Sequence, residues 1–374
     1  MSEFIEIPAH LLPKDGRFGS GPSKVTDAQV AALVAAQPGL LGTSHREAPV
    51  KNLVGDIRSM LAEFFRLPDG YEVILGNGGS TLFWDAAAFS LVERRAQHCT
   101  FGEFGAKFAT ATGRAPHLEG ASVRAVDPGG VILPEAEHGI DTYAWPHNET
   151  STGAIADVTR PLGIGEALTV VDGTSAAGGT HVDISQIDAY YFAPQKNFAS
   201  DGGLYFAILS PQAIARIESI SASGRYIPDS LSLALALENS RANQTLNTPA
   251  VATLVMMRTQ LEWLLEQGGM AFAAARTADS AGRLYDWASG FRHTEAYITN
   301  PINRSPVVAT LDLLSGVDAA EMRRHLKANG IVDIHPYRKL GRNQIRIGVF
   351  PAVDPDDVTA LIHSLEFLME RLVT

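Results

Sequence analysis

The chain has 374 residues, of which 45% are hydrophobic and 19% are charged, and its formal net charge is −11. This composition excludes a disordered chain, and the presence of a single cysteine, Cys99, excludes a disulfide framework. The negative charge disfavours nucleic acid and anionic membranes as partners, and no apolar stretch approaches the roughly 18 residues of a membrane span. We therefore expect a cytoplasmic protein with no nucleic-acid or membrane partner.

The first two-thirds of the chain alternate short apolar strands with helices. The sequence predicts a strand at Tyr71–Leu75, a turn at Gly76–Gly79 and a helix at Ser80–Gln97 with Ser80 or Thr81 as its N-cap. Apolar runs bounded by turns then predict strands buried on both faces, followed by a helix at Pro211–Ser223. The predicted strands are Thr142–Trp145, Leu168–Val171, Ala189–Phe192 and Leu204–Leu209. This alternation indicates an α/β fold with a mostly parallel sheet.

The pattern changes after about residue 250. Two long helices are predicted at Pro249–Gln267 and Gly269–Ser289, and a strand–helix–strand–helix series follows at Val307–Leu313, Asp318–Asn329, Asn343–Phe350 and Pro355–Leu372. We expect three parts: an N-terminal segment at 1–24 that contributes to the active site, a large domain at 25–267, and a small α+β domain at 268–374.

Two polar residues follow apolar strands in the middle of the chain. Lys196 comes shortly after Ala189–Phe192, and Asp172 directly follows Leu168–Val171. Because ligands bind outside the carboxyl ends of strands in an open α/β sheet, the two side chains could converge there. A buried lysine has a lowered pKa, which suits Schiff-base chemistry, and a buried carboxylate needs a cationic partner such as a protonated pyridine nitrogen. Taken singly, Lys196 could instead lie in an ordinary exposed loop and Asp172 could cap a turn.

Two further stretches are typical of anion-binding sites. The glycine-rich Gly76–Thr81 precedes a predicted helix, whose free N–H groups favour an anion, although a plain tight turn would explain the glycines equally well. Between Arg323 and Arg346, seven Lys and Arg residues oppose one Asp, and the loop His335–Arg342 contains arginines suited to phosphate or carboxylate. The histidines do not cluster with cysteine or carboxylates, so no metal site is expected.

Eight stretches occur in an order that resembles the phosphoserine aminotransferases, a class-V group of the fold-type I pyridoxal-phosphate enzymes. They are Gly19–Pro22, Thr43–Arg46, Gly76–Thr81, His147–Gly153, Val171–Asp172, Ala193–Asn197, Asn247–Pro249 and Ile345–Arg346. The resemblance spans nearly the whole chain and is strongest to the form found in actinobacteria. It implies a large domain with a mostly parallel sheet of the seven-stranded type between helices, and a smaller α+β C-terminal domain.

The resemblance also implies a role for each matching residue. Lys196 would bind the aldehyde of pyridoxal 5'-phosphate and later act as the general base, while Asp172 would pair with the pyridine nitrogen. The other cofactor-binding residues would be Ser80, Thr81, Phe104, Thr150 and Gln195, together with Asn247 and Thr248 from a second subunit. The substrate-binding residues would be Ser20, His45, Arg46, His335, Arg338 and Arg346, with Arg346 on the α-carboxylate. Many members of the family have Gly-Arg where this chain has Ser80-Thr81, and Trp where it has Phe104.

The implied reaction moves an amino group between L-glutamate and 3-phosphohydroxypyruvate, and yields O-phospho-L-serine and 2-oxoglutarate in a homodimer with shared active sites. Phosphohydroxythreonine, of vitamin B6 synthesis, is an additional expected substrate. A serine– or alanine–glyoxylate aminotransferase is the alternative within class V, which the arginine-rich loop disfavours. A cysteine desulfurase is disfavoured because Cys99 lies in or near a predicted element. A non-catalytic protein of the same fold is the alternative from another class, which Lys196 and Asp172 disfavour.

Overall fold

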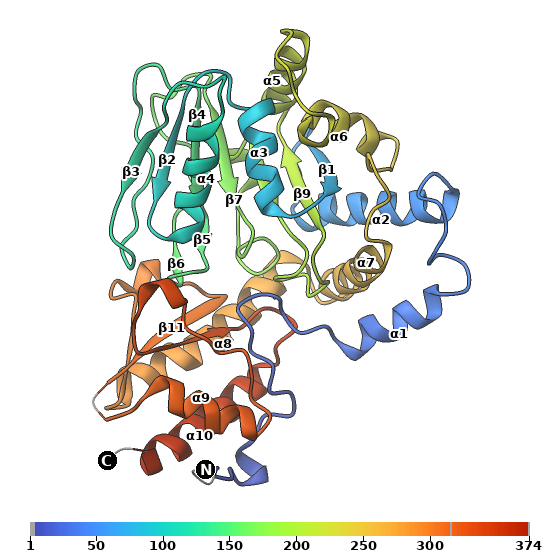
Figure 1. Cartoon of the computed structure of the whole chain (residues 1–374). Helices are drawn as coiled ribbons and strands as arrows, with labels where there is room; N and C mark the ends of the chain where they lie inside the picture. Colours follow the sequence, from blue (N-terminus) through green and yellow to red (C-terminus); the bar gives the residue numbers. More distant parts are fainter. Residues whose placement is uncertain (1–3, 315, 373–374) are drawn as a thin grey trace.

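The computed structural model describes residues 4–314 and 316–372, which form a large α/β part followed by a smaller C-terminal part (Figure 1). The large part is built on a seven-stranded sheet with the strand order β1-β9-β8-β7-β4-β2-β3. Its strands are β1 (Glu72–Asn77), β2 (Ala96–Thr100), β3 (Ser122–Ala125), β4 (Thr142–Pro146), β7 (Leu168–Asp172), β8 (Ala189–Phe192) and β9 (Leu204–Leu209). The predicted α/β class with a large sheet between helices is therefore confirmed.

Strand direction places the ends of β7 and β8 at the same edge of this sheet. β8, β7, β4, β2 and β3 pair in parallel, whereas β9 runs antiparallel to both of its neighbours, β8 and β1. In the register of the sheet Asp172 lies opposite Tyr191. The segment that follows Phe192 therefore starts beside Asp172, as expected for a site at the carboxyl ends of strands.

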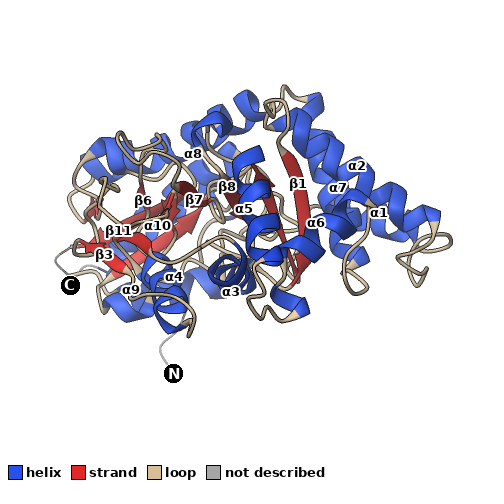
Figure 2. Cartoon of the chain, turned by 90° about the horizontal axis from the view of Figure 1, so that it is seen from above, coloured by secondary structure: helices blue, strands red, loops and turns tan. Residues whose placement is uncertain are grey.

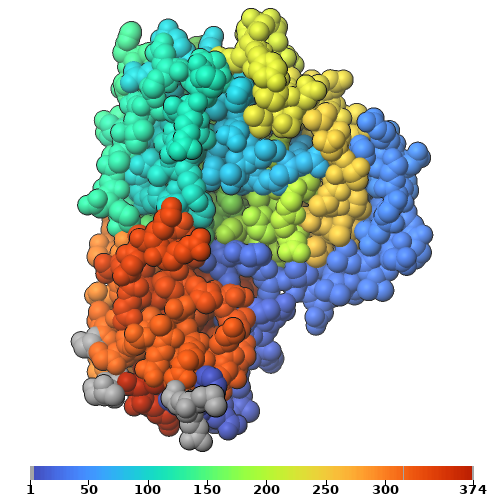
Figure 3. All heavy atoms as spheres, in the orientation of Figure 1, coloured from blue at the N-terminus to red at the C-terminus, as the bar shows by residue number. Residues whose placement is uncertain are grey.

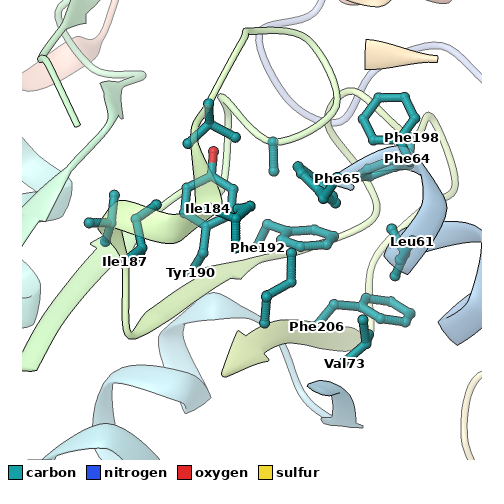
Figure 4. Packing of buried hydrophobic residues seen from close by; sticks show 14 of the residues in the cluster. Leu61, Phe64, Phe65, Val73, Ile184, Ile187, Tyr190, Phe192, Phe198 and Phe206 are labelled. Carbon is teal, nitrogen blue, oxygen red and sulfur yellow. The ribbon is translucent and has the colours of Figure 1, made fainter. Parts of the chain in front are cut away.

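Helices cover both faces of the large sheet (Figure 2). One face packs against α2 (Ala48–Phe64) and α7 (Val251–Glu266), and α1 (Asp27–Ala36) lies on α7. The other face packs against α3 (Ser80–Ser90), α4 (Glu103–Arg114), α5 (Pro211–Ala222) and α6 (Leu233–Arg241). Because strand side chains alternate between faces, Tyr190 and Phe192 enter the first core and Tyr191 enters the second. Figure 4 shows the first core, where Phe192 and Phe206 lie near Leu61, Phe64 and Phe65 at the end of α2.

The C-terminal part has its own buried cluster. It contains α8 (Met270–Gly290), β10 (Thr294–Ala296), β11 (Val308–Leu313), α9 (Ala319–Ala328), β12 (Gln344–Gly348) and α10 (Pro355–Leu372), with the three strands forming an antiparallel sheet. α8 begins against the large core at Ala273 and continues into the C-terminal cluster at Ala281 and Leu284. The division into 1–24, 25–267 and 268–374 stays a prediction.

The N-terminal segment packs on the C-terminal part, although the two are far apart in sequence (Figure 3). Ile7 and Phe18 are buried in the C-terminal cluster. The amide of Ile7 donates to Asn329 Oδ1 at 2.9 Å, and the amide of Lys14 donates to Asp357 Oδ1 at 2.8 Å. The segment then continues toward the large part, where the amide of Ser23 donates to the carbonyl of Gln195 at 2.7 Å.

The predicted helix Ser80–Gln97 is wrong in its second half. α3 ends at Ser90, and Ala96–Thr100 forms the buried strand β2. The buried polar side chains of this strand have hydrogen-bond partners. Gln97 Nε2 donates to the carbonyl of Glu135 at 3.0 Å, and His98 Nε2 lies 2.7 Å from Thr112 Oγ1. Within the described residues, no helix is long and apolar enough to cross a membrane.

Candidate active site

Asp172 is a buried carboxylate at the end of β7. Its side chain is 6% exposed, and Oδ1 accepts a hydrogen bond of 2.8 Å from the amide of Thr174. Burial raises its pKa above the ordinary value, while the hydrogen bonds from Thr174 and from the Tyr191 hydroxyl oppose this rise. Among residues 4–314 and 316–372, no Lys, Arg or His forms an ion pair with it. A buried carboxylate without such a partner suits a cationic ligand atom.

Lys196 lies in the turn after β8. Its Nζ donates a hydrogen bond of 2.7 Å to the main-chain carbonyl of Ser20. Burial lowers the pKa of this lysine to about 7, and the charge of Arg346 lowers it further while Asp172 raises it. At neutral pH a substantial share of the amine is therefore uncharged, which is the form that attacks a carbonyl carbon.

The glycine-rich N-terminal stretch passes directly over this lysine. A Cβ atom at Gly21 would lie 1.7 Å from Lys196 Nζ, and the φ of Gly21 is +137°. Only glycine fits this position, because both the space and the backbone conformation exclude a side chain. The expected contribution of Ser20 thus includes its carbonyl group, which accepts the hydrogen bond from Lys196.

The start of α3 has a different cap from the predicted one. Gly79 occupies the N-cap, and no side chain caps the helix. The Ser80 hydroxyl instead accepts a hydrogen bond of 2.7 Å from Thr174 Oγ1, so it is tied to the Asp172 loop. Within the described chain, no hydrogen bond uses the amide N–H groups of Ser80 and Thr81. The first turn of the helix can therefore receive an anion through these amides.

Thr150 and Arg346 meet between the two parts of the molecule. Thr150 follows the short strand β5 (Asn148–Glu149), which pairs with β6 (Ala154–Ile155), and its Oγ1 donates to Ser175 Oγ at 2.8 Å. Arg346, on β12, donates from Nη1 to the Thr150 carbonyl at 2.7 Å. Burial lowers the pKa of this guanidinium to about 10, so it remains a cation at neutral pH.

Phe104 lies in the first turn of α4, at the same edge of the sheet. Its ring contacts Tyr337 edge to face, with 6.2 Å between the ring centroids, and the Arg346 guanidinium lies 5.4 Å from the centroid of the Tyr337 ring.

Gln195 directly precedes Lys196 in the sequence, and its Oε1 is buried without a hydrogen-bond partner in the described structure. The structure therefore brings eight predicted residues into one neighbourhood: Ser20, Ser80, Thr81, Phe104, Thr150, Asp172, Gln195 and Arg346, around Lys196.

A second group of predicted residues contacts the end of β1, just before the turn that begins α3. Thr248 Oγ1 is 3.1 Å from His45 Nδ1, and Asn77 at the end of β1 contacts both the amide of Asn247 and the carbonyl of Thr248. Arg46, Asn247 and Thr248 are exposed to solvent. The loop between α1 and α2 that carries His45 lies at the edge of the large part, beyond α7 (Figure 1).

The loop at 335–342 offers fewer free cations than its sequence indicated. Arg342 forms an ion pair of 2.7 Å with Asp312, Lys339 pairs with Glu103, and His335 Nδ1 contacts Arg323 Nη1. Arg338 is exposed, and within the described residues its guanidinium contacts no acceptor. Glu149 and Tyr337 complete this neighbourhood, although our sequence analysis gave neither a role; the only signal was their position inside the stretches His147–Gly153 and His335–Arg342.

Comparison with known proteins agrees with this geometry. The family "Aminotransferase class-V" matches residues 22–334. A putative phosphoserine aminotransferase of Mycobacterium leprae is 57% identical over 368 residues, which cover 98% of each chain, and a phosphoserine aminotransferase of a Nocardioides species is 53% identical over the full length of both. In fold, the chain is similar to the crystal structure of a phosphoserine aminotransferase from Cytophaga hutchinsonii, with a TM-score of 0.86, 22% identity, and coverage of 94% of this chain and 99% of that one. The chain belongs to the class-V aminotransferases, a family of pyridoxal-phosphate enzymes, and within it to the phosphoserine aminotransferases.

Proposed function

We propose that this enzyme transfers an amino group between L-glutamate and 3-phosphohydroxypyruvate, and so forms 2-oxoglutarate and O-phospho-L-serine. The single observation that carries the proposal is the placement of Lys196, with its pKa lowered to about 7, beside the buried and unpaired Asp172 in a member of this family. Phosphohydroxythreonine, which shares the phosphate and the carboxylate, is a further substrate that we propose on the same grounds.

The residues of this neighbourhood fit pyridoxal phosphate. When bound, the cofactor supplies an aldehyde that captures amino groups and a ring that withdraws electrons from the substrate Cα atom. Asp172 would hold the ring nitrogen in its protonated form, because a buried carboxylate is stabilised by an adjacent cation. The amides of Ser80 and Thr81, which no hydrogen bond uses within the described residues, can donate to the phosphate, and Gln195 could donate to it from Nε2. Thr150 would bind the ring hydroxyl, and Phe104 would cover the ring.

Arg346 and Lys196 would act on the substrate. Arg346 donates from Nη1 to the Thr150 carbonyl at 2.7 Å and from Nε to the His335 carbonyl at 3.4 Å. These two hydrogen bonds orient the guanidinium and leave its other N–H donors for the α-carboxylate that all substrates share. The pKa of Lys196 is close to neutral pH, so its uncharged amine would take the proton from the substrate Cα atom as general base. The same group would donate the proton later, when the amino transfer is completed. Arg338, exposed and without an acceptor in the described chain, would help to bind the distal phosphate or carboxylate, with His335 beside it.

A homodimer would complete each site. His45 contacts Thr248, and Arg46, Asn247 and Thr248 are exposed on this chain; no described hydrogen bond joins these four residues to Lys196 or Asp172. The adjacent helix α1 is rich in alanine and valine, and Val30 and Val34, which lie one turn apart, are 50% and 72% exposed, so the helix has an exposed apolar face. We infer that this face packs on a second copy about a two-fold axis, so that each copy lends His45, Arg46, Asn247 and Thr248 to the site of the other.

A substrate panel tests the proposal. With L-glutamate as the amino donor, we expect kcat/KM to be highest for 3-phosphohydroxypyruvate and much lower for hydroxypyruvate and glyoxylate. A higher value for glyoxylate would instead identify a glyoxylate aminotransferase. No transfer to any keto acid, with cofactor bound, would overturn the proposed activity altogether.

A further inference from the structure

We propose that Glu149 is a positioning residue that holds Phe104 in place by capping the first turn of α4 from another element of the chain. This inference rests on the proposed contact between Phe104 and the cofactor ring. Glu149 ends the short strand β5, is fully buried, and lies 45 residues from Phe104 in sequence.

Hydrogen bonds connect this carboxylate to the beginning of α4. Its Oε2 accepts from the amide of Phe104 at 3.0 Å and from the amide of Gly105 at 3.1 Å. Its Oε1 accepts from the amide and the hydroxyl of Ser151, at 3.2 Å and 2.6 Å. Ser151 Oγ in turn accepts from the amide of Glu103 at 3.1 Å. The first three amides of α4 are thus all satisfied by residues 149–151.

The helix has no other cap. Its N-cap residue is Gly102, which has no side chain to offer, and a Cβ there would lie 2.3 Å from Glu149 Cγ. Glycine at this position makes room for the carboxylate, which takes over the role that Ser, Thr, Asp or Asn normally plays at an N-cap. The negative charge also lies at the positive end of the helix dipole, where it is favourable.

Residues 149–151 also contact other residues of the proposed site. Between the two capping residues, the Thr150 carbonyl accepts from Arg346 and its hydroxyl donates to Ser175, three residues after Asp172. Burying a carboxylate without an ion pair costs free energy, and among the described residues Glu149 forms no ion pair. Its hydrogen bonds offset this cost and set the backbone of Phe104, and so the place of the aromatic ring, relative to Thr150 and Arg346.

Two variants and a matched control test this role. Glu149→Gln keeps the shape but replaces one acceptor with a donor, and Glu149→Ala removes both acceptors. The control is Asp318→Ala, which removes the cap of α9, where Asp318 Oδ1 accepts from the amide of Glu321 at 2.7 Å in the C-terminal part. The first readout is amide hydrogen exchange of the cofactor-free protein over residues 103–106. The second is the visible circular dichroism of bound pyridoxal phosphate.

We expect each Glu149 variant to exchange about fivefold or more faster at residues 103–106, the usual effect of losing a cap, and to weaken the cofactor's dichroic band. Asp318→Ala should accelerate exchange only at the start of α9 and leave the band unchanged. Since Glu149→Ala could fail to fold, Glu149→Gln provides a second test: whichever way its amide group turns, it leaves either the α4 amides or the Ser151 amide without an acceptor, and it removes the negative charge at the start of α4.

Phe104→Leu separates this inference from the contact on which it rests. If Phe104→Leu leaves the dichroic band unchanged, the proposed contact of Phe104 with the ring is wrong. If Phe104→Leu weakens the band but the Glu149 variants do not, the positioning role is wrong, whether or not exchange at residues 103–106 is faster. A weakened band without faster exchange in the Glu149 variants also contradicts it, because the effect would not pass through α4.

Discussion

Arg346 Nη1 donates a hydrogen bond of 2.7 Å to the main-chain carbonyl of Thr150, and thereby joins β12 of the C-terminal part to the loop after β5 of the large part. This contact orients the guanidinium that we assign to the substrate α-carboxylate. Substitution of Arg346 tests its proposed role in binding substrate.

Arg346→Ala should weaken every substrate alike, because all of them carry the α-carboxylate. Loss of one such charged contact costs about 2–5 kcal/mol, which corresponds to a decrease of about 30-fold or more in kcat/KM. Arg342→Ala is the control, since Arg342 lies nearby but is paired with Asp312. Steady-state kinetics with L-glutamate and two keto acids would measure kcat/KM for both variants. A loss confined to one keto acid would contradict the assignment of Arg346 to the α-carboxylate.

Lys196 should be the residue that binds the cofactor covalently. We expect the purified protein to be yellow, and borohydride to fix the mass of the cofactor on the peptide that contains Lys196. Lys196→Ala should abolish turnover while it still binds the cofactor non-covalently. Peptide mass spectrometry and single-turnover assays measure these outcomes; near-normal turnover by the variant would show that another group does the chemistry.

The capture of pyridoxal phosphate by cofactor-free enzyme should depend on pH through the same lysine. Burial lowers its pKa from an ordinary value near 10.5 to about 7. The uncharged amine is the reactive form, so the rate should rise as pH increases toward 7 and level off above it. Stopped-flow absorbance would record this profile. A rate that keeps rising toward pH 10 would mean that the lysine is not desolvated.

Asp172→Asn should preserve the shape of the site and remove the charge that stabilises a protonated ring nitrogen. We expect kcat to decrease by about 100-fold, since one preorganised electrostatic group contributes roughly 3 kcal/mol. The cofactor should still bind, because the substitution leaves the proposed phosphate site at the start of α3 unchanged. A kcat within a few-fold of that of the wild type would refute the role of this carboxylate.

Arg46 and Arg338 should decide between phosphorylated and unphosphorylated substrates. Either Arg46→Ala or Arg338→Ala should lower kcat/KM for 3-phosphohydroxypyruvate far more than for hydroxypyruvate, because only the first carries the distal phosphate. For Arg46 the effect also requires the proposed dimer, in which Arg46 of one copy contributes to the site of the other. Mixed dimers of an Arg46→Ala subunit with a Lys196→Ala subunit would show which subunit supplies Arg46 to the active site. Equal losses on both keto acids would remove these arginines from the phosphate site.

Much of the architecture could be predicted from the sequence because buried strands leave a strong apolar signal. The predicted bounds Ala189–Phe192 and Leu204–Leu209 coincide with β8 and β9. β2 was missed because Gln97, His98 and Thr100 are polar, and their burial depends on partners such as Glu135 and Thr112 that become neighbours only in the fold. The antiparallel direction of β9 has no local signal, since it is set by the path of the preceding connection.

The chemistry of the site was easier to predict than its supporting contacts. Lys196 and Asp172 stand next to strands in the sequence, so topology alone brings them together. The Ser80 hydroxyl was expected to cap α3, but it contacts Thr174, which lies 94 residues away. Likewise, nothing local in the sequence connects Glu149 to the amides of α4. Such contacts depend on side chains from distant segments, and local propensity carries no information about them.

The packing of Ile7 and Phe18 into the C-terminal cluster also has a consequence for biosynthesis. A ribosome makes these residues long before α10, which helps to enclose them. Ile7 and Phe18 therefore lack part of their native surroundings until α10 has been translated. Gly21 follows this segment and lies over Lys196, so we expect the neighbourhood of Lys196 to be completed only after α10 has emerged, and not when β7 and β8 do.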